Sequence, residues 1–377
     1  MTLLAFLAAA CLSCSASGEG AEHNPNHRTA AEALPGIRTG PANFRYAQLL
    51  DRFRWVVSDD ARVWRTDDGG ISWTQCYTAE SDSSLGWKIR GLSFVDREIG
   101  FLIDRSVLMR TSDGGLTWTR AGEIKSPDQS CLLENCYFAQ SCCFSDPLNG
   151  WVVGLVHQSD YLIDPGLPAF VGLVLRTQDG GSTWARQKVS VPKGHINRTT
   201  RWALNDLFFE DRLFGWVVGD GAIFFTTDGG ESWRASEIDR RNRSAIFKKV
   251  SFVDHLHGWV IMKDQDDLLY TTDGGKTWRT LRGPAEMLGL QAFDVAFITP
   301  EHGFAILRRL YETTDGALHW KEVRQPACDA DRDFSFLGRA RDGSLVTGCS
   351  SGSLPLFITS TNDGRTWPLN SRRLQNH

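Results

Sequence analysis

The sequence TDDGGISW, residues Thr66 to Trp73, is the stretch that decides the fold. Its pattern, Thr-x-Asp-x-Gly-x-Thr/Ser-Trp, returns six more times at near-constant spacing. The successive copies start 45, 66, 49, 45, 42 and 47 residues apart. The further copies are TSDGGLTW (Thr111 to Trp118), TQDGGSTW (Thr177 to Trp184), TTDGGESW (Thr226 to Trp233), TTDGGKTW (Thr271 to Trp278), TTDGALHW (Thr313 to Trp320) and STNDGRTW (Ser360 to Trp367). A repeat of this length and period predicts a modular architecture.

Each copy has the composition of a tight turn between two antiparallel strands, known as an Asp-box. The carboxylate accepts hydrogen bonds from backbone N–H groups of its own turn. Glycine supplies the positive φ, and the tryptophan buries a large ring at the start of the next strand. We therefore interpret the acidic position as structural rather than catalytic. It is occupied by Asp68, Asp113, Asp179, Asp228, Asp273, Asp315 and Asn362, whose amide oxygen can also accept.

A second repeated element precedes most of these turns. It is a short apolar strand, a turn, then Gly-aromatic and a β-branched strand, as in SFVDREIGFLI (Ser93 to Ile103) and SFVDHLHGWVI (Ser251 to Ile261). A third strand leads into the Asp-box and a fourth leaves it. Four strands per unit in seven units predict an all-β protein, a seven-bladed β-propeller of four-stranded antiparallel blades spanning residues 40–368.

The chain ends are predicted to lie outside the propeller. Residues 1–17 contain a short apolar run with small residues and read as an export signal, in which Cys11 and Cys14 are lipidation candidates. The alternative is a plain cleaved signal. Residues 18–39 are interpreted as a polar linker and 369–377 as a C-terminal tail. The protein is expected in the periplasm, lumen or cell envelope, as a monomer that contacts a membrane only through such an anchor.

Seven cysteines follow the leader, four of them between Cys131 and Cys143 in what reads as one long loop. Export favours disulfides that staple this loop. A zinc site is the weaker alternative, because the spacing does not give paired ligands. No metal and no cofactor are predicted.

The strand order predicts which face of the ring varies. With strands a to d counted from the axis outward, the a–b turns and the Asp-boxes share one face and stay short. The b–c and d–a connections share the other, and all large length changes fall there. Elaborated loops on a rigid scaffold are where binding usually occurs.

The varied face also collects arginines. Arg198, Arg201, Arg240, Arg241 and Arg243 lie on two successive d–a connections, and we call them the basic patch. The alternative is that they are solvated loop charges without a partner. The net charge of −4 and the nearby acidic stretch 263–268 argue against nucleic acid, as does the lack of a stacking platform.

These two repeated motifs resemble the photosystem II assembly/stability factor propeller family over roughly residues 40–368. The resemblance implies a non-enzymatic, exported, sometimes lipid-anchored protein that functions in photosynthesis. It also implies a partner that is a membrane or membrane-associated protein, bound through an arginine-rich patch. The basic patch would be its analogue, although the cysteine-rich loop departs from the family pattern.

The main alternative is an Asp-box glycoside hydrolase of the sialidase or xyloglucanase type, and a sortilin-like peptide receptor is a further one. Asp59, Asp104 and Asp220 occupy matching b–c turns and would serve as carboxylates lining the axis. Tyr311 beside Glu312 is the nearest approach to a sialidase nucleophile pair. Ordinary turn chemistry explains the aspartates more simply, so no catalytic residue is predicted.

Overall fold

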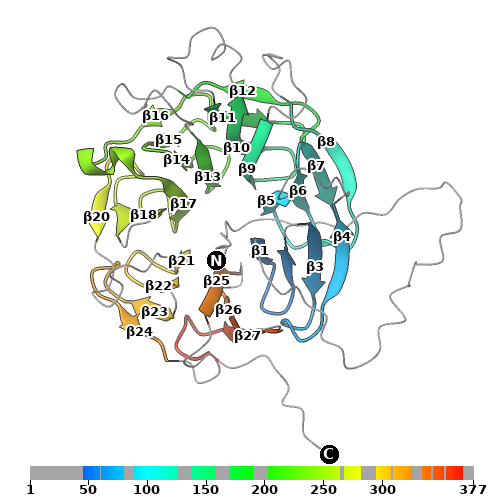
Figure 1. Cartoon of the computed structure of the whole chain (residues 1–377), viewed down its shortest axis with the longest axis vertical. Helices are drawn as coiled ribbons and strands as arrows, with labels where there is room; N and C mark the ends of the chain where they lie inside the picture. Colours follow the sequence, from blue (N-terminus) through cyan, green and yellow to red (C-terminus); the bar gives the residue numbers. More distant parts are fainter. Residues whose placement is uncertain are drawn as a thin grey trace, which may run out of the picture.

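The computed structural model describes residues 46–59, 61–79, 89–125, 137–157, 170–189, 203–263, 267–281, 294–306, 309–324, 333–340, 343–351 and 354–367. Within them the chain forms seven antiparallel sheets arranged around one axis (Figure 1), which confirms the predicted seven-bladed propeller. Each sheet is a run of consecutive strands, so the blades are numbered 1 to 7 in chain order.

The strand bounds follow the predicted units. Blades 1 to 3 comprise β1 (Tyr46–Leu49), β2 (Trp55–Ser58), β3 (Arg62–Thr66) and β4 (Thr74–Thr78); β5 (Ile89–Phe94), β6 (Gly100–Asp104), β7 (Val107–Thr111) and β8 (Thr119–Glu123); and β9 (Tyr137–Phe144), β10 (Gly150–His157), β11 (Phe170–Thr177) and β12 (Ala185–Gln187). Blades 4 and 5 comprise β13 (Leu204–Phe209), β14 (Gly215–Gly219), β15 (Ile223–Thr226) and β16 (Arg234–Ala235); and β17 (Phe247–Phe252), β18 (Gly258–Met262), β19 (Leu268–Thr271) and β20 (Arg279–Leu281). Blades 6 and 7 comprise β21 (Asp294–Phe297), β22 (Gly303–Ile306), β23 (Leu310–Thr313) and β24 (Lys321–Glu322); and β25 (Asp333–Arg339), β26 (Leu345–Ser351) and β27 (Leu354–Ser360).

The first strand of each blade lies nearest the axis. These strands contact one another in ring order, from β1 to β5 and onward to β25, which contacts β1 again. Blade 7 shows three strands in the described part of the chain, and residues 368–377 after its Asp-box, where a fourth strand would follow, fall outside it.

Stacked aromatic rings join neighbouring blades, and they explain the repeated Gly-aromatic pair. Trp151 on β10 stacks on Phe209 of blade 4 with ring centroids 3.6 Å apart, and Trp259 stacks on Phe297 of blade 6 at 3.5 Å. The glycine before each such ring leaves room for the phenylalanine of its own blade, since a Cβ on Gly150 would lie 2.3 Å from the Phe144 ring. Rings at this separation in a dry interface make strong dispersion contacts.

Buried polar side chains also link the innermost strands. Asp206 on β13 accepts a hydrogen bond from Ser141 of blade 3 and from the Val250 N–H of blade 5. Asp294 on β21 pairs with Lys249 of blade 5 and accepts from the backbone of blade 7 at Leu337. Such polar contacts fix the position of each blade relative to its neighbours, because hydrogen bonds and ion pairs are directional and apolar packing is not.

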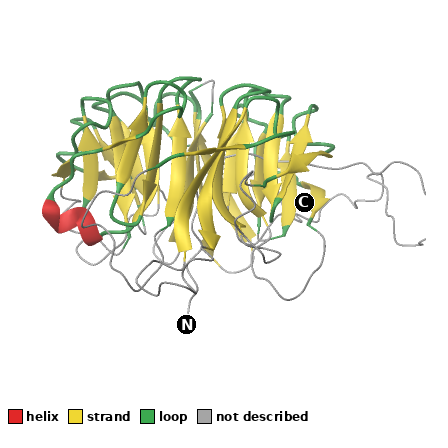
Figure 2. Cartoon of the chain, turned by 90° about the horizontal axis from the view of Figure 1, so that it is seen from above, coloured by secondary structure: helices red, strands yellow, loops and turns green. Residues whose placement is uncertain are grey.

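The two faces of the ring differ as predicted. The a–b turns and the Asp-box turns gather on one edge of the ring, which we call the constant face (Figure 2). The one short helix among the described residues, the 3-10 helix η3 (Arg240–Ser244), lies at the opposite edge.

Candidate partner-binding site

The helix η3 lies on the varied face of the ring, opposite the constant face. It lies in the d–a connection between β16 and β17, and Asp239 caps its start by accepting from the Arg241 N–H at 3.0 Å. Asn242 is 4% exposed and donates from Nδ2 to Thr280 Oγ1 of blade 5 at 3.1 Å. One inward-facing amide therefore anchors a turn whose other side chains face solvent.

The anchored turn presents arginines to solvent. Arg240, Arg241 and Arg243 are all exposed, and all follow or flank the buried Asn242. Arg241 makes an ion pair of 3.3 Å with Asp239 of its own turn, and both groups are well exposed. A surface pair of this kind contributes little to stability, so the guanidinium groups stay available for a ligand's carboxylates.

The structure describes only part of the basic patch. Arg240, Arg241 and Arg243 are brought together on η3. Arg198 and Arg201 lie outside the described residues, as do the lipidation candidates Cys11 and Cys14.

Two further basic residues are paired with carboxylates of the propeller itself. Lys249 is 8% exposed and pairs with Asp294 between the innermost strands of blades 5 and 6, so it is a structural lysine. Arg309 pairs with Glu322 of its own blade at 3.0 Å.

The predicted cysteine-rich loop is wrong at its C-terminal end. Cys142 and Cys143 lie inside β9 rather than in a loop, and both are free thiols, as is Cys76. Burial raises the pKa of the Cys142 thiol well above its ordinary value, and it raises the pKa of Cys143 to about 11. Cys142 acts as a small apolar residue between blades 2 and 3, and Cys143 packs against the apolar cluster between blades 3 and 4. Cys131, Cys136 and Cys328 lie outside the described residues.

The Asp-box aspartates accept hydrogen bonds from side chains and backbone N–H groups of their own turns. In blade 4, the carboxylate of Asp228 accepts from Thr226 Oγ1 at 2.7 Å and from the Ser232 N–H at 2.9 Å. Burial opposes ionisation, but the hydrogen bonds from the side chain and backbone of Ser232 outweigh it and lower the pKa of Asp228 to about 2. The same bonds recur at Asp68, Asp113, Asp179, Asp273 and Asp315, and Asn362 accepts from the Thr366 N–H.

The three b–c aspartates are each held by local structure. Asp59 accepts from the N–H groups of its own turn, and Asp220 accepts from the Ala203 N–H at 2.9 Å. Asp104 is 6% exposed and accepts from Tyr77 Oη of blade 1 at 2.6 Å, so it lies between two blades. These contacts agree with turn and interface roles, and Tyr311, 7% exposed, is likewise part of an apolar cluster.

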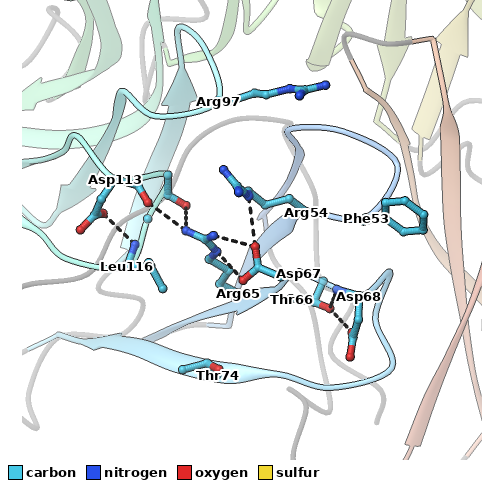
Figure 3. A network of polar contacts seen from close by, with 12 residues as sticks. Phe53, Arg54, Arg65, Thr66, Asp67, Asp68, Thr74, Arg97, Asp113 and Leu116 are labelled. Atoms are coloured by element: carbon cyan, nitrogen blue, oxygen red, sulfur yellow. Dashed lines mark hydrogen bonds and ion pairs between the residues drawn. The ribbon is translucent and has the colours of Figure 1, made fainter. Parts of the chain in front are cut away.

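A polar network that joins blades 1 and 2 on the constant face was not predicted. Arg65 is 5% exposed and reaches Asp67 with two nitrogens and the carbonyls of Asp113 and Gly114 in the next blade at 2.9 Å each (Figure 3). Arg54 approaches the same Asp67 carboxylate at 3.0 Å. The signal was available, since an arginine precedes the Asp-box threonine in three blades, at Arg65, Arg110 and Arg176.

The described part of the chain holds no cluster of three or more side chains suited to a metal ion. No helix in the described ranges has both the length and the apolar character needed to cross a bilayer.

A family model matches the part of the chain that contains η3. Residues 190–289 match the family model described as photosynthesis system II assembly factor YCF48, and this stretch contains η3 and all five arginines of the basic patch. The predicted family resemblance is confirmed.

A relative with a similar sequence is also a Ycf48 protein. The photosystem II assembly lipoprotein Ycf48 of Picosynechococcus sp. is 32% identical over 179 residues, which are 45% of this chain. The match spans half the length of that relative.

Solved structures share the fold at low identity. YCF48 bound to D1 peptide aligns with a TM-score of 0.52 at 19% identity, over 75% of this chain and 82% of that one. YCF48 from Cyanidioschyzon merolae aligns with a TM-score of 0.55 at 15% identity, over 82% and 92%. The GH74 xyloglucanase from Xanthomonas campestris aligns with a TM-score of 0.60 at 16% identity, over 88% and 55%. At these identities the likeness to Ycf48 and to the xyloglucanase establishes the propeller fold alone.

Proposed function

We propose that this chain is a non-catalytic, exported propeller that binds a membrane-protein partner during photosystem II assembly. The names of the matching family model and of the Picosynechococcus relative both refer to photosystem II assembly. The observation that carries the proposal is η3, where buried Asn242 holds Arg240, Arg241 and Arg243 outward. This turn lies inside the segment that matches the Ycf48 family model. The partner would present carboxylates, because exposed guanidinium groups bind carboxylates in a two-pronged geometry.

The D1 protein is the partner that one structural neighbour suggests, since that YCF48 was solved with a D1 peptide. The test is binding of a fluorescent D1 peptide to the full chain, measured by anisotropy. The variant Arg240→Glu/Arg241→Glu/Arg243→Glu is expected to lower affinity at least tenfold, which corresponds to about 1.4 kcal/mol.

The matched control is Arg97→Glu/Lys276→Glu/Arg365→Glu, which makes the same change in net charge at exposed positions of the constant face. Its affinity should stay within about twofold, apart from a small long-range effect that 0.15 M salt screens. Equal losses in the two variants would mean that only net charge matters, and the basic patch would be discarded.

A hydrolase function is disfavoured by the contacts that hold Asp59, Asp104 and Asp220 in turns and interfaces. Release of reducing sugar from xyloglucan or from a sialoside by the purified chain, lost in an Asp104→Asn variant, would overturn the non-catalytic proposal.

We extend the proposal to the N-terminal segment, because the Picosynechococcus relative is named a lipoprotein. Cys11 or Cys14 would carry the lipid, and the propeller would act as an anchored monomer in the envelope or lumen. Membrane fractionation of Cys11→Ser and Cys14→Ser variants tests this. The variant at the lipidated cysteine should move to the soluble fraction, and retention of both in membranes would refute the anchor.

A further inference from the structure

The constant face carries a set of exposed apolar side chains. Leu148, Leu213 and Leu256 are 54%, 51% and 41% exposed. Each is the fourth residue of an a–b turn that begins with Ser145, Glu210 or Val253, so they occupy one equivalent position. Their blades 3, 4 and 5 are neighbours in the ring, as the contacts of β13 with β9 and β17 show. We call these three residues the leucine arc.

The fold does not require leucine at this position. Glu98 in blade 2 and Glu301 in blade 6 occupy the same place in their a–b turns. Their carbonyls accept from the first glycine of the adjacent Asp-box at 2.8 Å, as the Leu148, Leu213 and Leu256 carbonyls do at 2.9, 2.9 and 3.0 Å. Because the turn uses only backbone groups of this residue, its side chain is free to be polar.

Exposed leucine at three adjacent equivalent positions therefore needs a reason outside the turn. Isolated exposed apolar residues are common on any protein surface. Here, however, six of the seven large exposed apolar side chains found in the described residues lie on the constant face. They are Phe53, Leu116, Leu148, Leu213, Leu256 and Leu318. A recurrent apolar position on one face is typical of a docking surface.

The surroundings of the leucine arc are acidic. The a–b and Asp-box turns of blades 3 to 5 carry eight carboxylates against two cationic side chains, Arg212 and Lys276. The carboxylates are those of Asp146, Asp179, Glu210, Asp211, Asp228, Glu231, Asp254 and Asp273. Arg212 is itself paired with Asp146 at 2.7 Å, and Arg176 reaches Glu231 at 3.5 Å from the end of β11. An anionic lipid surface would be repelled here, whereas a cationic ligand would be attracted.

The general spacing of packed sheets predicts how far apart the leucines of successive blades lie. Sheets that pack face to face lie about 10 Å apart, and seven residues of an α-helix rise about 10.5 Å. Apolar side chains one heptad apart would therefore meet leucines of successive blades.

From these observations we propose that the constant face of blades 3 to 5 is a second docking surface, and that its occupant is a basic amphipathic helix of a partner protein. The apolar stripe of the helix would pack on the leucine arc, and its flanking lysines and arginines would face the surrounding carboxylates. The surface is opposite η3, so the two could be occupied together.

The test uses a synthetic 21-residue helical peptide with leucines on one face and lysines beside them, measured by fluorescence anisotropy on the full chain at about 0.15 M salt. The variant Leu213→Glu/Leu256→Glu should weaken binding at least tenfold. The added glutamates would themselves attract a basic peptide, so a loss must come from the missing apolar contact. The control Leu116→Glu/Leu318→Glu adds the same charge to the same face outside the arc and should change affinity less than twofold.

Both variants are expected to fold, because Glu98 and Glu301 already occupy the arc position in other blades and Leu116 and Leu318 are exposed. Equal binding of a scrambled peptide of identical composition would show that charge alone attracts the ligand, and would overturn the proposal. So would equal losses in the two variants. Binding to phosphatidylglycerol vesicles, or dimerisation of the full chain, that depends on Leu213 and Leu256 would instead assign the arc to lipid or to a second copy. The variant at Arg240, Arg241 and Arg243 should bind the helical peptide normally, so this test is independent of the function proposed above.

Discussion

The second glycine of the blade 5 Asp-box, Gly275, lies against Trp216 of blade 4. The variant Gly275→Ala tests how much this contact between blades contributes to stability. Gly275 has φ +81°, and a Cβ there would lie 2.7 Å from Nε1 of Trp216 in blade 4. That indole donates to the Gly274 carbonyl at 2.8 Å, which joins blade 4 to the turn of blade 5.

The cost of this substitution has two parts. An alanine in the left-handed region costs about 1–2 kcal/mol, of which roughly 0.4–1 kcal/mol is offset by the lower entropy of the unfolded chain. Displacing Trp216 leaves its indole N–H without a partner, which costs about 1–3 kcal/mol more. We expect the free energy of unfolding to fall by about 2–4 kcal/mol.

A control separates the two parts. Gly343 has φ +84°, and nothing lies within 4 Å of a Cβ built there, so Gly343→Ala carries the backbone cost alone, about 1 kcal/mol or less. Urea unfolding followed by circular dichroism and tryptophan fluorescence measures both variants. Equal losses of stability would refute the inter-blade role of Trp216.

The sixth turn shows what an alanine at this position does. Ala317 replaces the second glycine at φ 74°, and the indole Nε1 of Trp259 above it, which is fully buried, has no partner among the described residues. In blades 3 and 4 the corresponding Trp151 and Trp216 each donate to a glycine carbonyl of the next Asp-box. The sixth Asp-box thus folds with an alanine at this position, and without a hydrogen bond of the kind that Trp151 and Trp216 make.

Three further predictions concern buried and turn charges. Burial raises the pKa of Asp206 from 3.8 to about 6, although hydrogen bonds from Val250 and Ser141 act in the opposite direction. Because the folded state binds this proton more tightly than the unfolded state, the site stabilises the fold below pH 4 by about 3 kcal/mol, and this contribution is lost as pH rises through 6. Asp206→Asn should therefore flatten the dependence of unfolding free energy on pH between 4 and 7, and wild-type and variant curves that run parallel would contradict the assignment. Asp228 has the opposite sign: its pKa is lowered to about 2, so its contribution is present above pH 4 and is lost as pH falls toward 2. In thermal unfolding, the melting temperature of Asp228→Asn should fall less than that of wild type over that acid range. Arg65→Lys should cost about 1.5–3 kcal/mol in urea unfolding, because one ammonium cannot replace the paired contacts of a buried guanidinium; the exposed control Arg120→Lys should stay within about 0.5 kcal/mol, and an equal effect would discount the network.

Much of the fold was predictable because its turns are local. The Asp68 carboxylate, the Thr66 hydroxyl and the Ser72 N–H lie within seven residues, so their hydrogen bonds can be inferred from spacing alone. The repeat period then gave the number of blades, and the alternation of long and short connections predicted which face varies. The arginines of η3 followed from their place in a d–a connection.

Contacts between blades could not be predicted from the spacing of residues in the sequence. Lys249 has the composition of a surface charge, yet it is buried against Asp294, which is 45 residues away. Cys142 and Cys143 have the composition of a stapled loop, yet they lie inside β9. Each depends on strand register against another blade, and a one-residue shift in register reverses which side chains are buried.

The sequence by itself determined the number of blades, their strand order and the chemistry of each turn, because these arise from interactions between residues close in the chain. Tertiary structure alone decided which polar residues join blades and which apolar residues remain exposed. Leu148, Leu213 and Leu256 are spread over more than one hundred residues of sequence, and only closure of the ring places them side by side on adjacent blades.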